Sequence, residues 1–245
     1  MKNCIVVACT LFFTVASFAQ KASTTIKEVT KKTVSHDAWS GLLSRNVKDG
    51  LVNYTGFKTE KATLTAYTKS LASLVPTNTT PKNEAMAYWI NAYNAFTVLL
   101  IIDNFGVKSI KDINKGEPWK LKTISLGGAN YSLDQIENEI LRPKYKDARI
   151  HFAINCAAKS CPPLRNTAFT ALDLNTQLDE QTKNFINNAQ NNTINTKTAK
   201  LSKIFDWFKA DFGDIVSFIN KYSTTKITKT TKISYNDYDW SLNGK

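Results

Sequence analysis

The longest apolar stretch of the chain covers residues 85–102 and predicts one helix at the centre of the fold. Nearly every residue in it is apolar, and Gly106 follows as a residue typical of helix ends. A helix that is apolar on all sides is buried in a core or spans a membrane. Amides are costly in hydrocarbon, and this stretch contains Asn91 and Asn94. We therefore expect a core helix whose two asparagines bind neighbouring backbone.

Shorter amphipathic stretches predict further helices and a few strands. Apolar residues recur at helical spacing from residue 39 onward, over residues 58–74 and over residues 172–186. Ser132 and Gln135 form a capping-box pattern that begins another helix, which Pro143 is expected to close. Alternating positions predict strands over residues 119–126, 199–201 and 227–235. Gly127 and Gly128 predict a hairpin turn from the first of these strands into residues 129–131. The pattern as a whole predicts an α+β fold: a helix-rich single domain with one long buried central helix and a small, mostly antiparallel sheet.

Another strand is predicted over residues 149–155, the stretch with most of the candidate chemistry. Ile150, Phe152 and Ile154 alternate there with four less apolar residues: Arg149, His151, Ala153 and Asn155. Small residues and two prolines follow, so we expect a loop after the strand. Cys156 and Cys161 lie in that loop.

The first 19 residues have the pattern of a signal peptide. A short polar start precedes an apolar run over residues 5–18, and Ser17 and Ala19 are small residues at the positions that a signal peptidase reads. We expect cleavage near Ala19, a Lys/Thr-rich flexible tether over residues 20–35, and a single domain over residues 36–245. The apolar run is too short for a comfortable membrane anchor. The mature chain would be exported, periplasmic or secreted, and without a transmembrane segment.

The chain carries a formal net charge of +12, spread mainly over scattered lysines. It has no Arg-rich stripe and no alternation of aromatic and basic residues, so nucleic acid is not an expected partner. The charge favours a solvated surface and, at most, weak attraction to anionic envelope surfaces. The sequence identifies no specific partner.

Signal cleavage would leave Cys156 and Cys161 as the cysteines of the mature chain, and they define the first hypothesis for a site. In it, Cys156 is a nucleophile, His151 its base and Glu137 the group that orients the imidazole. A helical turn beginning at Cys156 would help to stabilise its thiolate. An objection is that His151 and Cys156 would face opposite sides of a continuous strand. The hypothesis needs a bend near Asn155, or Cys161 in place of Cys156.

Other interpretations of the same residues are structural. In an oxidising compartment Cys156 and Cys161 can form a disulfide. Glu137 falls within the apolar arc of its helix, so it is expected to be partly buried and to need a partner, such as Arg149 or Arg165. Zinc could use His151, Glu137 and the two cysteines, but their spacing matches no standard zinc pattern, and no cofactor is expected.

Several segments together resemble the family known as domain of unknown function 547, DUF547. They are residues 39–54, 88–95, 136–142, 151–164, 202–205 and 238–243. The family more often has Asp where this chain has Asn53 in a Val-Asn-Tyr segment. The resemblance implies a DUF547-like domain of an exported bacterial type, and no established activity, cofactor or substrate.

Two functions of different classes follow from these residues. One is a hydrolase or acyl-transfer enzyme of the cell envelope, centred on Cys156, Cys161, His151 and Glu137, with Asn155, Arg149, Asn91 and Asn94 in support. The other is a non-catalytic binding or scaffold domain with a structural Cys156–Cys161 disulfide. The number of free thiols in the native protein would distinguish them.

Overall fold

Helix α4 (Lys82–Asp103) is the centre of the fold in the computed structural model, which describes Met1 and residues 33–245. Its middle is buried on all sides, from Ala85 to Ile102. By length and composition α4 could cross a membrane, but 83% of its most apolar window is buried inside the protein. The predicted central core helix is confirmed. The predicted signal peptide and the tether up to residue 32 lie outside the described residues, apart from Met1.

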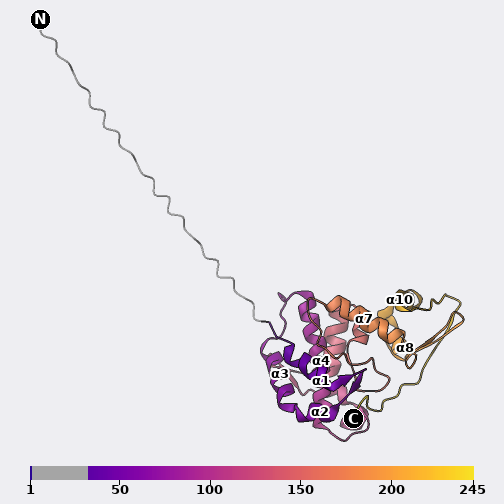
Figure 1. Cartoon of the computed structure of the whole chain (residues 1–245), viewed down its shortest axis with the longest axis horizontal. Coiled ribbons are helices and arrows are strands. Elements are labelled where there is room, and N and C mark those ends of the chain that lie inside the picture. Colours follow the sequence, from indigo (N-terminus) through magenta and orange to yellow (C-terminus); the bar gives the residue numbers. More distant parts are fainter. Residues whose placement is uncertain (2–32) are drawn as a thin grey trace. The chain divides into compact units, whose positions relative to one another are not determined.

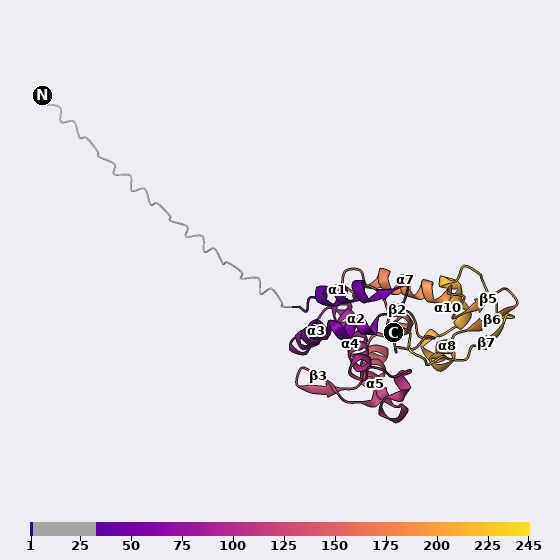
Figure 2. The same ribbon diagram turned by 60° about the horizontal axis from the view of Figure 1, so that its bottom comes forward.

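Near the start of the described chain, α2 (Tyr54–Thr59) and α3 (Lys61–Ser73) pack against α4, and α1 (Asp37–Asn46) packs on α2 and α3 (Figures 1 and 2). Trp39 of α1 is fully buried and stacks on Tyr67 of α3, with ring centroids 5.9 Å apart. A short antiparallel pair, β1 (Val47–Lys48) and β2 (Leu51–Val52), separates α1 from α2. Asn53 caps α2 by accepting a hydrogen bond from the backbone of Gly56 at 2.9 Å, a role that Asp would also fill.

A run of short elements follows α4 and forms one side of the later site. They are η1 (Ile110–Asp112), η2 (Asn114–Gly116), η3 (Pro118–Lys120), β3 (Ile124–Leu126), β4 (Ala129–Tyr131), α5 (Leu133–Gln135), η4 (Ile136–Leu141) and α6 (Arg142–Tyr145). The predicted hairpin is present as β3–β4, but the strand is shorter than expected. The capping box of Ser132 and Gln135 is also present.

Pro143 does not close this helix, as the sequence had suggested. Element η4 is a π-helix, and the backbone N–H of Arg142 bonds to the carbonyl of Glu137, five residues earlier. Proline lacks an N–H and its ring clashes with a carbonyl in the preceding α-helical turn. The wider π-helix ends at Leu141, two residues before Pro143, and the helix continues past the proline as α6. π-turns within helices are frequent at functional sites.

The second half of the described chain is organised around α7 (Leu174–Ile186) and a small sheet (Figure 2). Its remaining elements are η5 (Ala148–Phe152), β5 (Thr193–Ile194), β6 (Thr198–Leu201), α8 (Ile204–Trp207), α9 (Lys209–Phe212), α10 (Ile215–Tyr222) and β7 (Lys232–Tyr235). The sheet has the order β5-β6-β7, with β5 antiparallel and β7 parallel to β6. The α+β class is confirmed, with the strands spread over three small sheets.

Residues 149–155 are not the predicted strand. Element η5 is a 3₁₀-helix, in which the N–H of Ala153 bonds to the carbonyl of Ile150 at 2.9 Å. The side chain of Asp147 caps it through the N–H of Arg149 at 3.0 Å. The apolar alternation has another cause, because Ile150 is buried in the hydrophobic cluster around α4 and Phe152 in the cluster around α7. A segment buried between two clusters can be apolar at alternate positions without being extended.

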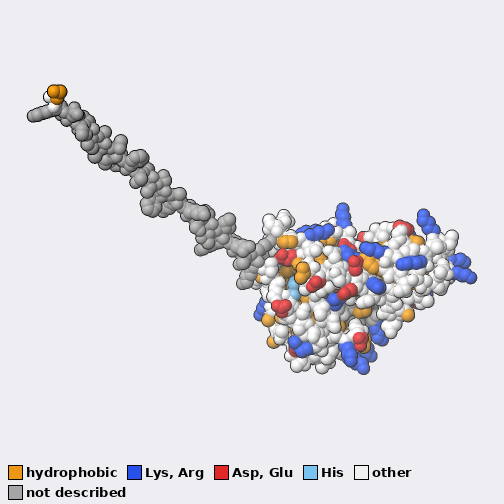
Figure 3. Space-filling model, turned by 45° about the horizontal axis from the view of Figure 1, so that its top comes forward, with side chains coloured by type: hydrophobic (Ala, Val, Ile, Leu, Met, Phe, Trp, Pro, Cys, Tyr) orange, Lys and Arg blue, Asp and Glu red, His pale blue; other side chains and the backbone are white. Residues whose placement is uncertain are grey.

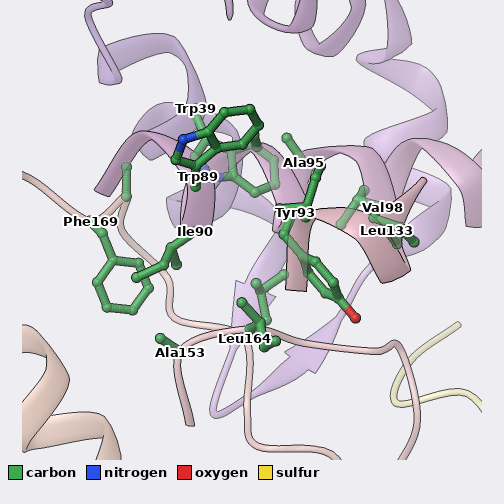
Figure 4. Packing of buried hydrophobic residues seen from close by; sticks show 14 of the residues in the cluster. Trp39, Trp89, Ile90, Tyr93, Ala95, Val98, Leu133, Ala153, Leu164 and Phe169 are labelled. Carbon is green, nitrogen blue, oxygen red and sulfur yellow. The ribbon is translucent and has the colours of Figure 1, made fainter. Parts of the chain in front are cut away.

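Residues 33–245 form one compact unit that contains both hydrophobic clusters. Val34, near the end of the predicted tether, packs against the cluster around α4. Figure 4 shows part of that cluster, with Tyr93 extending from α4 and its hydroxyl pointing away from the helix axis. The segment from η5 to the cysteines runs between the two clusters, and the candidate site lies beside it.

Candidate functional site

A pocket of about 310 Å³ lies where the two clusters meet. Its walls come from α4, from the turns η2 and η3, from α5 and η4, from η5 and the loop after it, from α8 and from residues 238–240. Four predicted site residues line it: Glu137, His151, Cys156 and Cys161. The structure therefore gathers these side chains around one pocket, although they lie on three different segments: η4, η5 and the cysteine loop.

Buried asparagines position the loop that carries the thiols. Asn94 of α4 is 2% exposed; its Nδ2 donates to the carbonyl of Ala153 at 2.9 Å and its Oδ1 accepts from the backbone N–H of Asn155 at 2.8 Å. Asn155 in turn donates to the carbonyl of Pro162 and accepts from the N–H of Ala157. The two ends of the cysteine loop are thereby joined to each other and to the central helix.

The C-terminal segment covers the outer side of the same loop. The N–H of Lys159 donates to the carbonyl of Ser241 at 2.8 Å, and Asn243 donates from Nδ2 to Asn155 at 3.2 Å. Tyr54 of α2 donates its hydroxyl proton to Asn243 Oδ1 at 2.7 Å. Residues from both ends of the described chain thus fix the cysteine loop.

No helix begins at Cys156, so the expected contribution of a helix dipole is absent. Ala157, the next residue, is fully buried and has a φ of 62°, in the left-handed region that a side chain disfavours. Asn155 holds this conformation through its hydrogen bond to the N–H of Ala157 at 2.9 Å. Such conformations cluster at active sites, where surrounding contacts maintain them.

Hydrogen bonds favour the thiolate of Cys156. The thiol is hydrogen-bonded to that of Cys161, with the sulfurs 2.7 Å apart, and its Sγ lies 3.2 Å from the hydroxyl of Tyr238. Burial and the nearby Glu137 raise the pKa of Cys156, but hydrogen bonds from Cys161, Tyr238 and the Ala158 backbone outweigh them and lower it. Burial raises the pKa of Cys161 well above its ordinary value. Both are free thiols, and Cys156 is the one that ionises first.

Glu137 is half-buried beside the thiols, as its position in the apolar arc predicted. Its partner is the hydroxyl of Tyr93, which donates to Oε2 at 3.3 Å, and not Arg149 or Arg165. Burial raises the pKa of Glu137 to about 7, although Tyr93 and Arg142 oppose the rise. The carboxyl therefore exchanges a proton near neutral pH.

His151 is held by a different carboxylate from the expected one. Its Nε2 is 2.8 Å from Oδ2 of Asp211, which also accepts from Arg142 at 2.6 Å. The ring stacks on Phe208, with centroids 4.0 Å apart. Burial lowers the pKa of His151 to about 4 despite Asp211, so the imidazole is neutral near pH 7. Glu137 therefore does not orient the imidazole, because Asp211 occupies that position.

Two predicted supporting residues lie away from the pocket. Arg149 forms ion pairs with Asp147 at 2.6 Å and Asp179 at 3.0 Å, and so joins η5 to α7. Asn91 makes two hydrogen bonds to the backbone of Phe169, at 2.8 and 3.0 Å. Asn91 and Asn94 of α4 therefore both bind backbone, as expected. No three His, Cys, Asp or Glu side chains within residues 33–245 are arranged to hold a metal ion.

Sequence reasoning missed three residues of this site: Tyr93, Asp211 and Tyr238. Tyr93 and Tyr238 lie in segments that carry the family resemblance, and that was a signal for them. Asp211 had no such signal in the sequence, because its partners Arg142 and His151 lie 69 and 60 positions before it. Only the fold brings these three residues to the pocket or its wall.

The fold and the pocket define an α+β protein with a paired-thiol site between two hydrophobic clusters. Residues 76–186 match the family described as "Protein of unknown function, DUF547", which confirms the family predicted from the sequence. The matched segment contains Tyr93, Glu137, His151 and both cysteines, whereas Asp211 and Tyr238 follow it. No curated protein and no solved structure matches the chain.

Proposed function

We propose that this protein is a thiol-dependent hydrolase or acyl-transfer enzyme with Cys156 as its nucleophile. The observation that carries the proposal is the low-pKa thiol of Cys156 in the wall of a pocket, hydrogen-bonded to Cys161 and Tyr238. A thiolate is the nucleophilic form of cysteine, and enzymes favour it by placing donors around the sulfur. Cys161 acts as a donor in this arrangement, because its own pKa is raised.

Glu137 supplies the proton transfers in this scheme. A catalytic acid or base works best when its pKa is near the working pH, and that of Glu137 is raised to about 7. The Cys156 thiolate attacks the carbonyl carbon, and protonated Glu137 gives its proton to the leaving group as the thioester forms. The Glu137 carboxylate then takes a proton from water, and the resulting hydroxide attacks the thioester. Cys156 leaves as the thiolate, the acid product loses its proton to solvent, and Glu137 is protonated again. His151, with a pKa of about 4 and a bond to Asp211, is a weaker base.

An activated ester tests this scheme directly. The reduced protein is incubated with p-nitrophenyl hexanoate, quenched in acid and digested, and the peptides are analysed by mass spectrometry. We expect a hexanoyl adduct on Cys156 that Cys161→Ser retains and Cys156→Ser lacks. Glu137→Gln should still be acylated, because p-nitrophenolate leaves without a proton, but should accumulate the adduct. Reactive thiols without any adduct at Cys156 would rule out the enzyme.

A second function, a non-catalytic binding domain closed by a disulfide, is favoured by the same pair of sulfurs. At 2.7 Å, Cys156 and Cys161 need little movement to form a bond under oxidising conditions. Thiol titration of protein purified without reductant tests it. Two titratable thiols per protein would exclude the disulfide-bridged form. The absence of titratable thiols, in purified protein that still binds its ligand fully, would support the bridged form.

We also propose that the protein acts outside the cytoplasm, in the cell envelope or beyond. The support is the signal-like pattern of the first 19 residues. The mass and first residue of protein recovered from the exported fraction check this proposal. Gln20 at the amino terminus is the expected result, and an intact Met1 in the exported or the cytoplasmic fraction would overturn it.

A further inference from the structure

Two walls of the pocket differ in their chemistry, and the first is aromatic. Its rings are those of Trp119, Trp207, Tyr238 and Trp240. Ring centroids lie 4.5 Å apart for Tyr238 and Trp240, 4.8 Å for Trp207 and Tyr238, and 5.4 Å for Trp119 and Trp240. The rings therefore form one continuous surface. Trp207 remains 45% exposed, which is unusual for a large apolar side chain in contact with other rings.

A second part of the pocket lining is acidic. It contains Glu117, Asp134 and Glu137, together with the cation of Lys120. Lys120 is already paired with Glu117 at 2.6 Å. Asp134 accepts a hydrogen bond from the Asn138 amide at 2.8 Å. Neither Asp134 nor Glu137 forms an ion pair within 4.0 Å with another residue of the described part of the chain, although Lys120 lies close enough to Asp134, and Arg142 to Glu137, to interact with them.

This local charge is opposite to that of the protein as a whole. The chain has a net charge of +12, and Figure 3 shows lysine and arginine side chains distributed over the visible face. In the pocket, the pKa of Cys156 is lowered, which favours its thiolate beside the carboxyl groups of Asp134 and Glu137. An anionic ligand would meet repulsion there, whereas a cation would neutralise charges that are partly removed from water.

Aromatic faces also attract cations, because the ring quadrupole is negative above its plane. The aromatic wall already shows this behaviour: Nζ of Lys111, which does not line the pocket, lies 4.3 Å from the ring centroid of Trp240. Rings also provide apolar surface for the alkyl or ring carbons next to a charged group. A pocket lined both by carboxyl groups and by aromatic rings therefore fits a ligand that has a positive charge on an apolar stem.

We infer that the pocket selects ligands that carry an ammonium group on an alkyl or ring stem. The inference rests on the proposed function, and it identifies the substrate class as esters or amides with an ammonium group near the reacting carbonyl. Asp134, together with Glu137, faces the ammonium group, and the aromatic wall covers the stem. The volume of about 310 Å³ limits the occupant to a small molecule or the end of a longer one.

Binding without turnover tests the ligand class separately from the reaction. The Cys156→Ala variant of the full protein is titrated calorimetrically with hexylammonium chloride, sodium hexanoate and 1-hexanol, which have the same stem. We expect hexylammonium to bind at least ~10-fold more tightly than hexanol, with hexanoate weakest. Equal affinities for the three ligands, or no saturable binding of hexylammonium, would overturn the inference. Methyl glucoside, an uncharged sugar, is titrated in the same way, and tighter binding of it than of hexylammonium would also overturn the inference.

A matched pair of variants assigns the effect to the pocket. Asp134→Asn, in the Cys156→Ala background, should weaken hexylammonium by ~3-fold or more and leave hexanol unchanged. Glu139→Gln is the control, because Glu139 is exposed on η4, which directly follows the α5 helix of Asp134, and does not line the pocket. An equal loss in both variants would show a general charge effect and overturn the role of Asp134.

Turnover by the unsubstituted protein separates this inference from the proposed function. Its substrates are p-nitrophenyl 6-aminohexanoate and p-nitrophenyl hexanoate, which differ in charge. A higher kcat/KM for the amino ester supports both ideas. Turnover of both esters at equal kcat/KM refutes the selection and leaves the enzyme. No acylation by either ester, with hexylammonium still binding, refutes the enzyme and leaves a binding site for ammonium ligands.

Discussion

Asn94 gives the sharpest test of how the fold positions the thiols. The Asn94→Ala change removes two hydrogen bonds that hold the segment before Cys156 against α4: one to the carbonyl of Ala153 and one from the N–H of Asn155. Both backbone groups are buried with Asn94, so neither gains water easily. A buried polar group left without a partner costs ~1–3 kcal/mol, so the expected loss of unfolding free energy is ~2–6 kcal/mol.

Two other asparagines provide controls: Asn91 of the same helix, and Asn104, which follows its last residue. Asn91→Ala also removes two buried hydrogen bonds, to Phe169, and should cost a similar amount. Asn104→Ala removes one bond, to the carbonyl of Leu100 near the helix end, and should cost ~1 kcal/mol or less. Urea unfolding, followed by circular dichroism, gives the three free energies.

The second measurement is the rate at which iodoacetamide alkylates Cys156 in the native, reduced protein. Asn94→Ala should slow it near neutral pH, because the loop no longer holds Cys156 against the donors that lower its pKa. Asn91→Ala should leave the rate unchanged, since its partner lies outside the cysteine loop. A loss below 1 kcal/mol for Asn94→Ala, or equal alkylation rates in both variants, would refute the reasoning.

Three further predictions concern the pocket. Tyr238→Phe removes a donor to the Cys156 thiolate, so the pH profile of alkylation should move to higher pH; an unmoved profile would contradict that role. The pKa of Glu137 rises on folding from 4.5 to about 7, so the folded state binds the extra proton and stability falls as pH rises through that window. Unfolding of Glu137→Gln at several pH values should lack this component. Asp211→Asn should cost ~1–3 kcal/mol, and an unchanged imidazole NMR signal of His151 would refute their contact.

The sequence by itself determined the elements whose signals are local. The apolar stretch of α4 required burial, whatever packs around it, because so many consecutive apolar residues leave no polar face. The Ser132 capping box and the β3–β4 hairpin followed from side-chain and turn chemistry within a few residues. The position of Glu137 in an apolar arc likewise predicted a partly buried carboxylate that needs a partner.

The local sequence pattern led to a wrong prediction where burial on two sides of a segment produced the apolar alternation typical of a strand. In η5, the alternation of Ile150 and Phe152 arises from two different hydrophobic clusters, and the backbone is a 3₁₀-helix. Pro143 was misread for a related reason. A proline predicts the end of an α-helix, but a π-turn and its surrounding contacts accommodated it.

The tertiary structure alone decided which side chains meet. It placed Asp211 rather than Glu137 on the imidazole of His151, and Tyr238 beside Cys156, through contacts between residues 60 and 82 positions apart. The pKa values of these groups depend on burial and on such distant partners, and neither can be obtained from a local pattern. The residue types of the candidate site were therefore visible in the sequence, whereas their pairing and ionisation depended on the packing of the two clusters.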